Sequence, residues 1–279
     1  MTHSRHVDNQ TPAGPASPAS AGKKPLPLSV LGVISIGSLV LIWWLVTWLK
    51  FIDPLFLPSP WAVIGKLRQV AVTGYLDATL WQHLWASLQR IGIALVAALF
   101  TAIPLGIAIG RYRVAQGLFD PLIEFYRPIP PLAYLPLIVI WCGIGELSKV
   151  LLIYLAIFAP VVIATANGVR SVDPAKIRAA QSLGATTRQL TRYVIIPAAL
   201  PDILTGIRIG LGVGWSTLVA AELIAATRGL GFMVQSAAQF LVTDVVIMGI
   251  LVIAAVACLM ETGLRYIQRR WVPWHGRFH

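Results

Sequence analysis

Charged residues are scarce in this sequence. Only 12% of its 279 residues are Asp, Glu, Lys or Arg, whereas 57% are hydrophobic. Soluble domains carry about 25% charged residues, so most of this chain must contact lipid or other apolar helices. We therefore predict an all-α membrane protein that crosses the inner (plasma) membrane several times.

Acidic residues are the scarcer of the two charged kinds: 11 Asp and Glu stand against 22 Lys and Arg, a formal net charge of +11. In a soluble protein such an excess can indicate nucleic-acid binding, but no nucleic-acid motif accompanies it. Membrane proteins concentrate Lys and Arg in cytoplasmic loops. We therefore expect a lipid bilayer as partner, and no nucleic acid.

Cysteines and catalytic groups are equally sparse. Cys142 and Cys258 both lie in apolar runs, which is typical of small buried residues and not of a disulfide or a metal site. The sequence has no His-Glu metal motif, no Gly-x-Ser-x-Gly elbow and no phosphate loop. The interiors of the predicted spans are nearly bare of the ionisable groups that proton-coupled carriers use. We predict a non-enzymatic chain that binds no metal or cofactor and takes its energy from another subunit.

What the sequence does contain is a series of long apolar runs. A helix needs about 20 apolar residues to cross the hydrocarbon core. Six segments approach this length and predict six transmembrane helices: 28–49, 91–109, 128–145, 150–169, 203–225 and 245–260. They form one predicted permease domain, residues 28–268, between a disordered cytoplasmic tail rich in Pro, Ala and Ser, residues 1–27, and a cytoplasmic C-terminal tail, residues 269–279.

Basic residues orient these spans. With the amino terminus inside, the internal Lys and Arg are Arg5, Lys23, Lys24, Arg111, Arg113, Arg170, Lys176, Arg178, Arg188, Arg192, Arg265, Arg269, Arg270 and Arg277. The external ones are Lys50, Lys66, Arg68, Lys149 and Arg228. This distribution follows the positive-inside rule and predicts that both termini are cytoplasmic.

Small residues recur every four positions in two of the predicted spans. They are Ala94, Ala98, Ala102, Gly106 and Gly110 in the second span, and Gly206, Gly210 and Gly214 in the fifth. In lipid, small residues allow helix backbones to approach closely. The stripes fit either a packed core about which two halves rock or ordinary helix packing.

The third predicted span cannot be a straight helix because it carries Pro128, Pro130, Pro131 and Pro136. Irregular backbone at membrane depth is tolerated only where protein or a water-filled cavity covers it. We expect either a broken helix near a pathway or subunit interface, or a kinked and buried helix. Segment 61–72, in the longest external connection, fits either an interfacial helix or a short packed helix.

The polar segment 171–201 lies between the fourth and fifth spans. Asp173 is placed to cap a short helix that begins at the next residue, and Gly184 is a natural left-handed terminator. A second short helix, capped by Thr186, is expected to run to Pro197. Two short helices around a glycine bend predict a compact cytoplasmic projection, although an ordinary loop remains the alternative.

This segment resembles the glutamate-alanine-alanine loop of bacterial ABC importer permeases. The matching residues are Ala179, Ala180, Gly184, Val194, Ile196 and Pro197. In that family the loop docks into the ATPase subunit and transmits its closure to the spans. Arg178 stands where the family pattern has Glu, which puts in doubt any salt bridge made by that Glu but not the docking itself.

The resemblance extends over nearly the whole chain after residue 28. Segments 125–136 and 141–145 are similar to the nitrate, sulfonate and taurine branch of these permeases, and segments 214–222 and 227–231 to its taurine-transporting members. The resemblance implies a type I ABC importer permease fold and a role as the transmembrane subunit that imports taurine or a closely related alkanesulfonate. Nitrate or another small organic anion is the alternative solute, and a stand-alone secondary carrier or a membrane enzyme the alternative class.

The same resemblance implies the partners. It implies a homodimer of the permease, two cytoplasmic ABC ATPase subunits that consume ATP, and a periplasmic binding protein that delivers the solute. Coupling is assigned to Arg178, Ala179, Ala180, Gly184 and Pro197.

The residues that line the pathway are sought in the fifth span. Trp215, Ser216 and Thr217 are candidate wall residues because they are polar positions in an apolar helix, although both hydroxyls could instead bond to neighbouring backbone. Glu222 is the fourth candidate. We expect it near the outer surface, paired with Arg228.

Overall fold

The computed structural model describes residues 28–272, and every regular element in that range is helical. The predicted tail 1–27 and residues 273–279 lie outside the described residues. The elements are α1 (Leu28–Trp48), α2 (Pro60–Val72), α3 (Leu80–Arg111), α4 (Arg113–Tyr126), the 3₁₀ turn η1 (Pro131–Tyr134), α5 (Leu135–Cys142), α6 (Glu146–Arg170), α7 (Pro174–Ser182), α8 (Thr187–Leu190), the π-helical turn η2 (Thr191–Ile195), α9 (Ile196–Ala225), α10 (Leu230–Gln239) and α11 (Thr243–Trp271).

Five of the described helices are long and apolar enough to cross a membrane. They are α1, α3, α6, α9 with the α8 segment before it, and α11. A sixth crossing is present if α4 and the η1–α5 segment, bent by 90° at a short break, count as one span. The predicted all-α membrane fold is confirmed, and the predicted number of six spans is reached when this bent pair counts as one crossing. The part of α1 up to Trp43 belongs to a unit separate from the rest of the chain and is described by itself.

The third crossing differs from the prediction. Helices α3 and α6 run in the same direction, because Arg90 contacts Glu146 near one pair of ends and Gly110 lies against Val169 near the other. The chain between them must therefore return across the bundle. Segment 128–145 alone is too short for this, since α5 has only eight residues, about 12 Å of helix. The return begins in α4.

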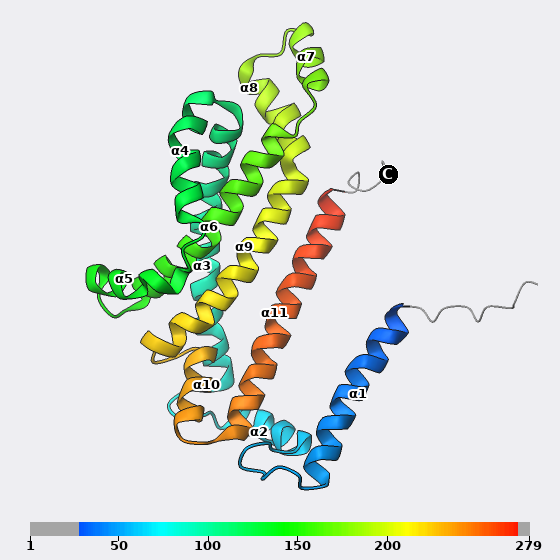
Figure 1. Ribbon diagram of the computed structural model, residues 1–279, viewed down its shortest axis with the longest axis vertical. Helices are drawn as coiled ribbons and strands as arrows, with labels where there is room; N and C mark the ends of the chain where they lie inside the picture. The colour runs from blue at the N-terminus through cyan, green and yellow to red at the C-terminus, as the bar shows by residue number, and fades with distance from the viewer. Residues whose placement is uncertain (1–27, 273–279) are drawn as a thin grey trace, which may run out of the picture. The chain divides into compact units, whose positions relative to one another are not determined.

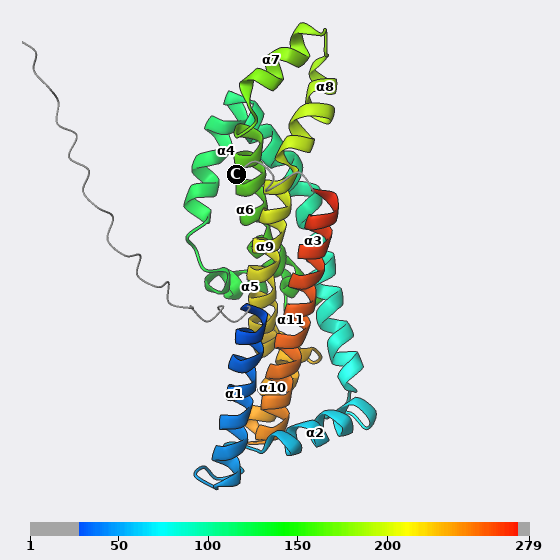
Figure 2. The same ribbon diagram turned by 90° about the vertical axis from the view of Figure 1, so that its right-hand side faces the viewer.

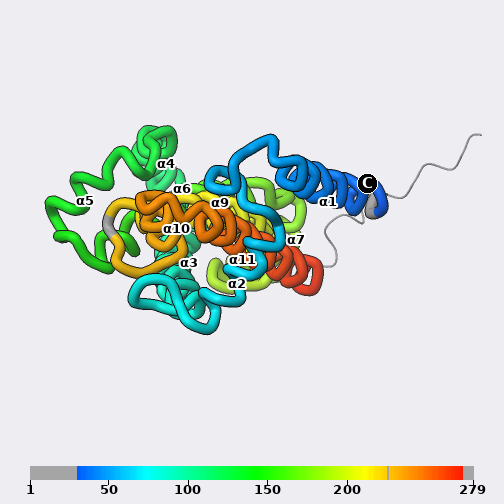
Figure 3. Tube along the Cα trace, turned by 90° about the horizontal axis from the view of Figure 1, so that it is seen from below, coloured from blue at the N-terminus to red at the C-terminus, as the bar shows by residue number. Residues whose placement is uncertain are grey.

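Helix α4 escaped the search for charge-free runs because it contains Arg113, Asp120 and Glu124. Its bend into η1 and α5 falls at the prolines that the sequence marked. Leu135 and Ile138 of α5 are buried with Leu152 of α6 and fix the bent segment against that helix. Figures 1 and 3 both show α5 at one side of the bundle, with α9 between it and α11.

The predicted small-residue stripes both pack on α6. Ala94, Ala98 and Ala102 of α3 have no exposed surface. A Cβ atom at Gly106 would lie 2.6 Å from the Cβ of Thr165, and one at Gly214 would lie 2.6 Å from Cγ1 of Ile157. Close approach of α3 and of α9 to α6 therefore requires small residues, as expected for helices that pack in lipid.

The short helices lie at opposite ends of the long ones. Helices α7 and α8 extend beyond one end, here called the loop end, while α2 and α10 lie at the other, here called the α2 end (Figures 1 and 2). The basic residues at or toward the loop end are Arg111, Arg113, Arg170, Lys176, Arg178, Arg188, Arg192, Arg265, Arg269 and Arg270. Those at or toward the α2 end are Lys50, Lys66, Arg68, Arg90, Lys149 and Arg228.

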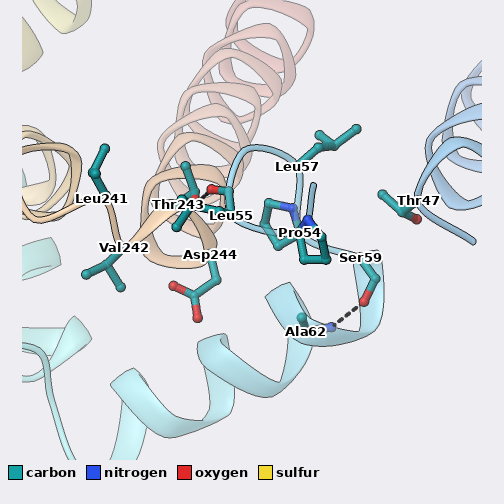
Figure 4. Close-up of a pocket in the computed structure, with 11 residues that line it drawn as sticks. Thr47, Pro54, Leu55, Leu57, Ser59, Ala62, Leu241, Val242, Thr243 and Asp244 are labelled. Atoms are coloured by element: carbon teal, nitrogen blue, oxygen red, sulfur yellow. Dashed lines mark hydrogen bonds between the residues drawn. The ribbon is translucent and has the colours of Figure 1, made fainter. Parts of the chain in front are cut away.

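Helix α2 crosses the α2 end at a steep angle to α11 (Figure 2). Val63 and Val70 are buried, whereas Trp61 is 72% exposed, so the helix packs on one face and leaves an apolar residue on the other. Lys66 forms a salt bridge of 3.3 Å with Asp244 at the start of α11. The segment before α2 is held to α11 as well, because the Thr243 hydroxyl donates to the Leu55 carbonyl (Figure 4).

Candidate coupling loop and transport pathway

The first helix of the candidate coupling loop has the predicted boundaries. The Asp173 carboxylate accepts a 2.8 Å hydrogen bond from the Ala175 amide and caps α7. The helix ends at Ser182, and Gly184, which follows its C-cap Leu183, has a φ of +80°. The Ala185 amide donates to the Ala180 carbonyl at 3.1 Å. This is the arrangement of a Schellman motif, in which glycine provides the left-handed residue at low conformational cost.

The second short helix begins as predicted but does not end at Pro197. Thr186 and Gln189 form a reciprocal capping box at the start of α8. The chain then continues through the π turn η2 directly into α9, with the Ile196 amide donating to the Thr191 carbonyl five residues earlier. Pro197 is tolerated because it lies in the first turn of α9, where a missing N–H is easily accommodated.

The outer face of the loop is uncovered in a single chain. Arg178 and Ala179 are exposed, and Leu183 at the bend is 90% exposed. Within residues 28–272 no carboxylate pairs with Arg178. The bend therefore presents one apolar side chain and one unpaired cation to the surroundings of the chain.

The four candidate pathway residues of α9 are not equivalent. Trp215 and Thr217 are buried, with 7% and 5% exposure, and Ser216 is exposed. The Ser216 hydroxyl donates to the Gly212 carbonyl at 3.2 Å, and that of Thr217 to the Val213 carbonyl at 2.9 Å. The alternative expectation, that these hydroxyls bond to neighbouring backbone, is confirmed.

Glu222 is completely buried, and its predicted pairing with Arg228 is wrong. Its carboxylate accepts hydrogen bonds from Arg90 Nη1 at 2.6 Å, from Ser87 Oγ at 2.8 Å and from the Gly231 amide at 2.9 Å. Arg228 contributes only its backbone carbonyl, which accepts a hydrogen bond of 2.7 Å from Arg90 Nη1. The expected partner was near in sequence, whereas the observed one lies 132 positions away.

These contacts belong to a larger set, here called the Arg90 cluster: Ser87, Arg90, Glu146, Lys149 and Glu222. Arg90 also donates to both Glu146 oxygens at 2.7 and 2.8 Å, and Lys149 donates to Glu146 at 2.7 Å. Two cations therefore balance two carboxylates. The cluster joins α3, α6, α9 and the start of α10 near the α2 end, and its full pairing indicates a structural role.

A second polar feature lies at the middle of the bundle. A cavity of about 410 Å³, here called the mid-depth cavity, opens between α4, η1, α6 and α9. Its lining comprises Tyr126, Arg127, Ile129, Pro131, Tyr134, Leu155, Ala156, Ala159, Pro160, Ile163, Ala164, Asn167, Ile209 and Val213. The sequence signalled it only through the prolines that break the third span, because such a break requires a covering cavity or protein.

Another cavity, of about 470 Å³, lies at the α2 end between the segment preceding α2 and the start of α11 (Figure 4). Its carboxylate, Asp244, is already paired with Lys66. Within the described residues, no group of three or more His, Cys, Asp or Glu side chains could hold a metal ion.

Comparison with known proteins identifies the family. Residues 102–273 match the model of the binding-protein-dependent transport system inner membrane component. The chain is 63% identical over 254 residues to the taurine transport system permease protein TauC of Escherichia coli K12, covering 90% of this chain and 92% of that protein.

More distant relatives belong to the same class. The putative aliphatic sulfonates transport permease protein SsuC of Escherichia coli K12 is 34% identical, with 86% of this chain and 90% of that protein covered. The nitrate import permease protein NrtB of Synechocystis is 30% identical, with 78% and 81% covered.

The fold is similar to that of solved ABC importers. A structure of the MetNI methionine ABC transporter in an inward-facing conformation matches with a TM-score of 0.62 at 17% identity, covering 71% of this chain and 99% of that one. The chain therefore belongs to the family of binding-protein-dependent transport system inner membrane components, and it is the non-catalytic, membrane-embedded permease subunit of an ABC importer.

Proposed function

We propose that this permease imports taurine or a closely related alkanesulfonate. The observation that carries the proposal is its 63% identity, over 90% of the chain, to a taurine transport permease. Identity to a permease for aliphatic sulfonates falls to 34% and to a nitrate import permease to 30%. Nitrate is therefore the weaker alternative as solute.

The complex that we propose contains two copies of this chain, two cytoplasmic ATPases and one external binding protein. The loop end faces the cytoplasm in this proposal, because the basic residues gather there. The exposed bend around Leu183 would insert into the ATPase, and the α2 end would receive the binding protein.

Coupling in this proposal passes through α7 and α8. ATP binding would draw the two ATPases together and move both loops, and the continuous helical path from α8 through η2 into α9 would carry that movement into the bundle. Arg178, Ala179 and Ala180 form the contact surface on α7, Gly184 fixes its angle to α8, and Pro197 marks the entry into α9. Hydrolysis would reset the pathway.

We also propose that Ser216 faces the pathway. It shares an exposed face of α9 with Ile209 and Val213, because residues four and seven positions apart lie on one side of a helix. Both of these residues line the mid-depth cavity. Trp215, Thr217 and Glu222 point into the packed chain, and we assign them a supporting role beside the pathway.

The test is uptake of radiolabelled taurine into proteoliposomes that contain this permease with its ATPase and binding protein. We expect uptake that requires ATP and the binding protein and that excess unlabelled taurine suppresses more strongly than excess nitrate. Preferential suppression by nitrate would overturn the assigned solute. Uptake by the permease alone, without ATPase, would instead show a secondary carrier.

A further inference from the structure

Arg127 lies midway along the helical bundle without an anionic partner among the described residues. It follows the last residue of α4, a helix of 14 residues that starts at the loop end, so it lies about 21 Å into the bundle. Other residues around the same cavity agree on this depth, because Pro160 and Val213 lie near the middles of α6 and α9. Throughout residues 28–272, no carboxylate forms a salt bridge with Arg127, not even Glu124 one turn earlier.

An unpaired guanidinium at this depth is costly, and such residues usually face a water-filled cavity where they serve transport. Arg127 lines the mid-depth cavity. Its planar set of N–H donors matches the oxygens of an anionic group such as a sulfonate or a carboxylate. The cavity therefore holds one group that attracts the anionic end of a solute.

Two tyrosines of the same cavity, Tyr126 and Tyr134, provide a hydrogen-bond acceptor for the cationic end of a solute. The Tyr126 hydroxyl donates its single proton to the Leu155 carbonyl at 2.9 Å. In the 2.7 Å contact between Tyr126 and Tyr134, the proton must therefore come from Tyr134. This leaves the Tyr134 oxygen with free lone pairs, which can accept a hydrogen bond from an ammonium group.

A backbone carbonyl adds to this acceptor side. Pro160 has no N–H and cannot donate to the carbonyl of Ala156 four residues earlier, as a normal helical residue would. Both Ala156 and Pro160 line the cavity. The aromatic faces of Tyr126 and Tyr134 would further favour a cation.

We propose that the mid-depth cavity is a transient binding site for a zwitterionic sulfonate, in which Arg127 binds the sulfonate and Tyr134 accepts from the ammonium. The volume of about 410 Å³ lies within the range of about 300–1,000 Å³ that is usual for small-molecule sites. Weak binding suits the task, because a transported solute must also leave. This proposal rests on the proposed function for the identity of the solute.

The experiment measures binding of radiolabelled taurine to the permease–ATPase complex in nanodiscs, without the binding protein, by scintillation proximity. We expect saturable binding, and a loss of about 10- to 100-fold in affinity for Arg127→Ala, because hydrogen bonds to a charged group are lost. Tyr134→Phe should weaken taurine but leave ethanesulfonate unchanged, since ethanesulfonate has no ammonium group.

Glu124→Gln is the matched control, because it removes a neighbouring charge on the same helix and should leave affinity unchanged. Equal affinity of Arg127→Ala and wild type would overturn the proposal, as would a loss in Glu124→Gln as large as that in Arg127→Ala. Absence of saturable binding would also overturn it. If the wild-type complex transports taurine in proteoliposomes while any of these results holds, only the cavity site fails and the proposed function stands.

Discussion

Two arginines inside the same bundle have opposite surroundings. Arg90 is 4% exposed, and its guanidinium donates hydrogen bonds to Glu146, Glu222 and the Arg228 carbonyl. Arg127 is exposed to the mid-depth cavity and pairs with no carboxylate in the described part of the chain. The first arginine is neutralised by the protein, and the second is left available to a mobile anion.

The difference indicates that the charge of Arg90 stabilises the fold, whereas we propose that the charge of Arg127 binds the solute. A buried ion pair adds little stability by itself, but removal of one partner leaves an uncompensated charge that is strongly destabilising. An unpaired charge in a cavity can be removed at little cost to the fold, because its removal leaves no opposite charge without a partner. Stability and transport should therefore respond to different arginines.

The largest effect is expected from Arg90→Met, which leaves the Glu222 carboxylate buried without its cation. We expect a loss of about 3–5 kcal/mol, seen as a strongly lowered thermal midpoint of the detergent-solubilised complex followed by fluorescence-detected size exclusion. Arg127→Ala is the matched control and should melt near the wild type. The double variant Arg90→Met/Glu222→Gln should recover part of the loss. Equal thermal midpoints of Arg90→Met and Arg127→Ala would show that the two arginines do not differ in their contribution to stability.

Gly184→Val is expected to have a large effect on the coupling of ATP hydrolysis to transport. It should leave the surroundings of Arg90 and Arg127 unchanged. A side chain at this position meets no atom within 4 Å, so the cost arises only from the left-handed φ, about 1–2 kcal/mol. The bend between α7 and α8 should change while the bundle stays intact. We expect normal insertion and taurine binding, with ATP hydrolysis no longer stimulated by loaded binding protein. Normal stimulation in this variant would show that the glycine bend is dispensable.

A moderate effect is expected from Ser216→Leu. The residue lies on the exposed face of α9 beside the mid-depth cavity, so a larger side chain should obstruct passage without disturbing packing. Taurine uptake by proteoliposomes should fall several-fold at an unchanged thermal midpoint, whereas Ser216→Ala should transport normally. Normal uptake by the leucine variant would place the pathway elsewhere.

The smallest effect is expected from Asp120→Asn. Its 2.7 Å ion pair with Arg170 is partly exposed on both sides, at 28% and 36%, and such pairs contribute about 0–1 kcal/mol. The thermal midpoint should change little, in contrast to the Arg90 variant. A loss comparable to that of Arg90→Met would show that burial does not decide the cost of breaking an ion pair in this bundle.

Much of the fold follows from local sequence rules. The apolar runs predict the long helices, and the small-residue stripes predict which faces of α3 and α9 pack closely. Asp173 and Thr186 predict the starts of the two coupling-loop helices, and Gly184 predicts the bend between them. Each of these features depends on residues within a few turns of one another. The structure confirms them for this reason.

The remaining features depend on residues far apart in the chain. Arg90 and Glu222 meet only because α3 and α9 both pack on α6, so sequence proximity suggested Arg228 instead. Helix α4 was missed because Arg113, Asp120 and Glu124 interrupt its apolar residues, so it contains no long charge-free run. Arg127 lies directly before the predicted span 128–145, where the sequence gives it no distinguishing feature, and its importance follows only from the cavity beside it.

The π turn at the base of α9 has a consequence for how this protein can vary. A π turn contains one residue more than the α-helical turn it replaces, and each residue rotates a helix by about 100°. Loss or gain of a single residue within 191–195 would rotate α7 around the axis of α9 and direct Leu183 away from the ATPase contact that we propose for it. Substitutions within residues 191–195 should therefore be tolerated, whereas insertions and deletions there should abolish assembly with the ATPase.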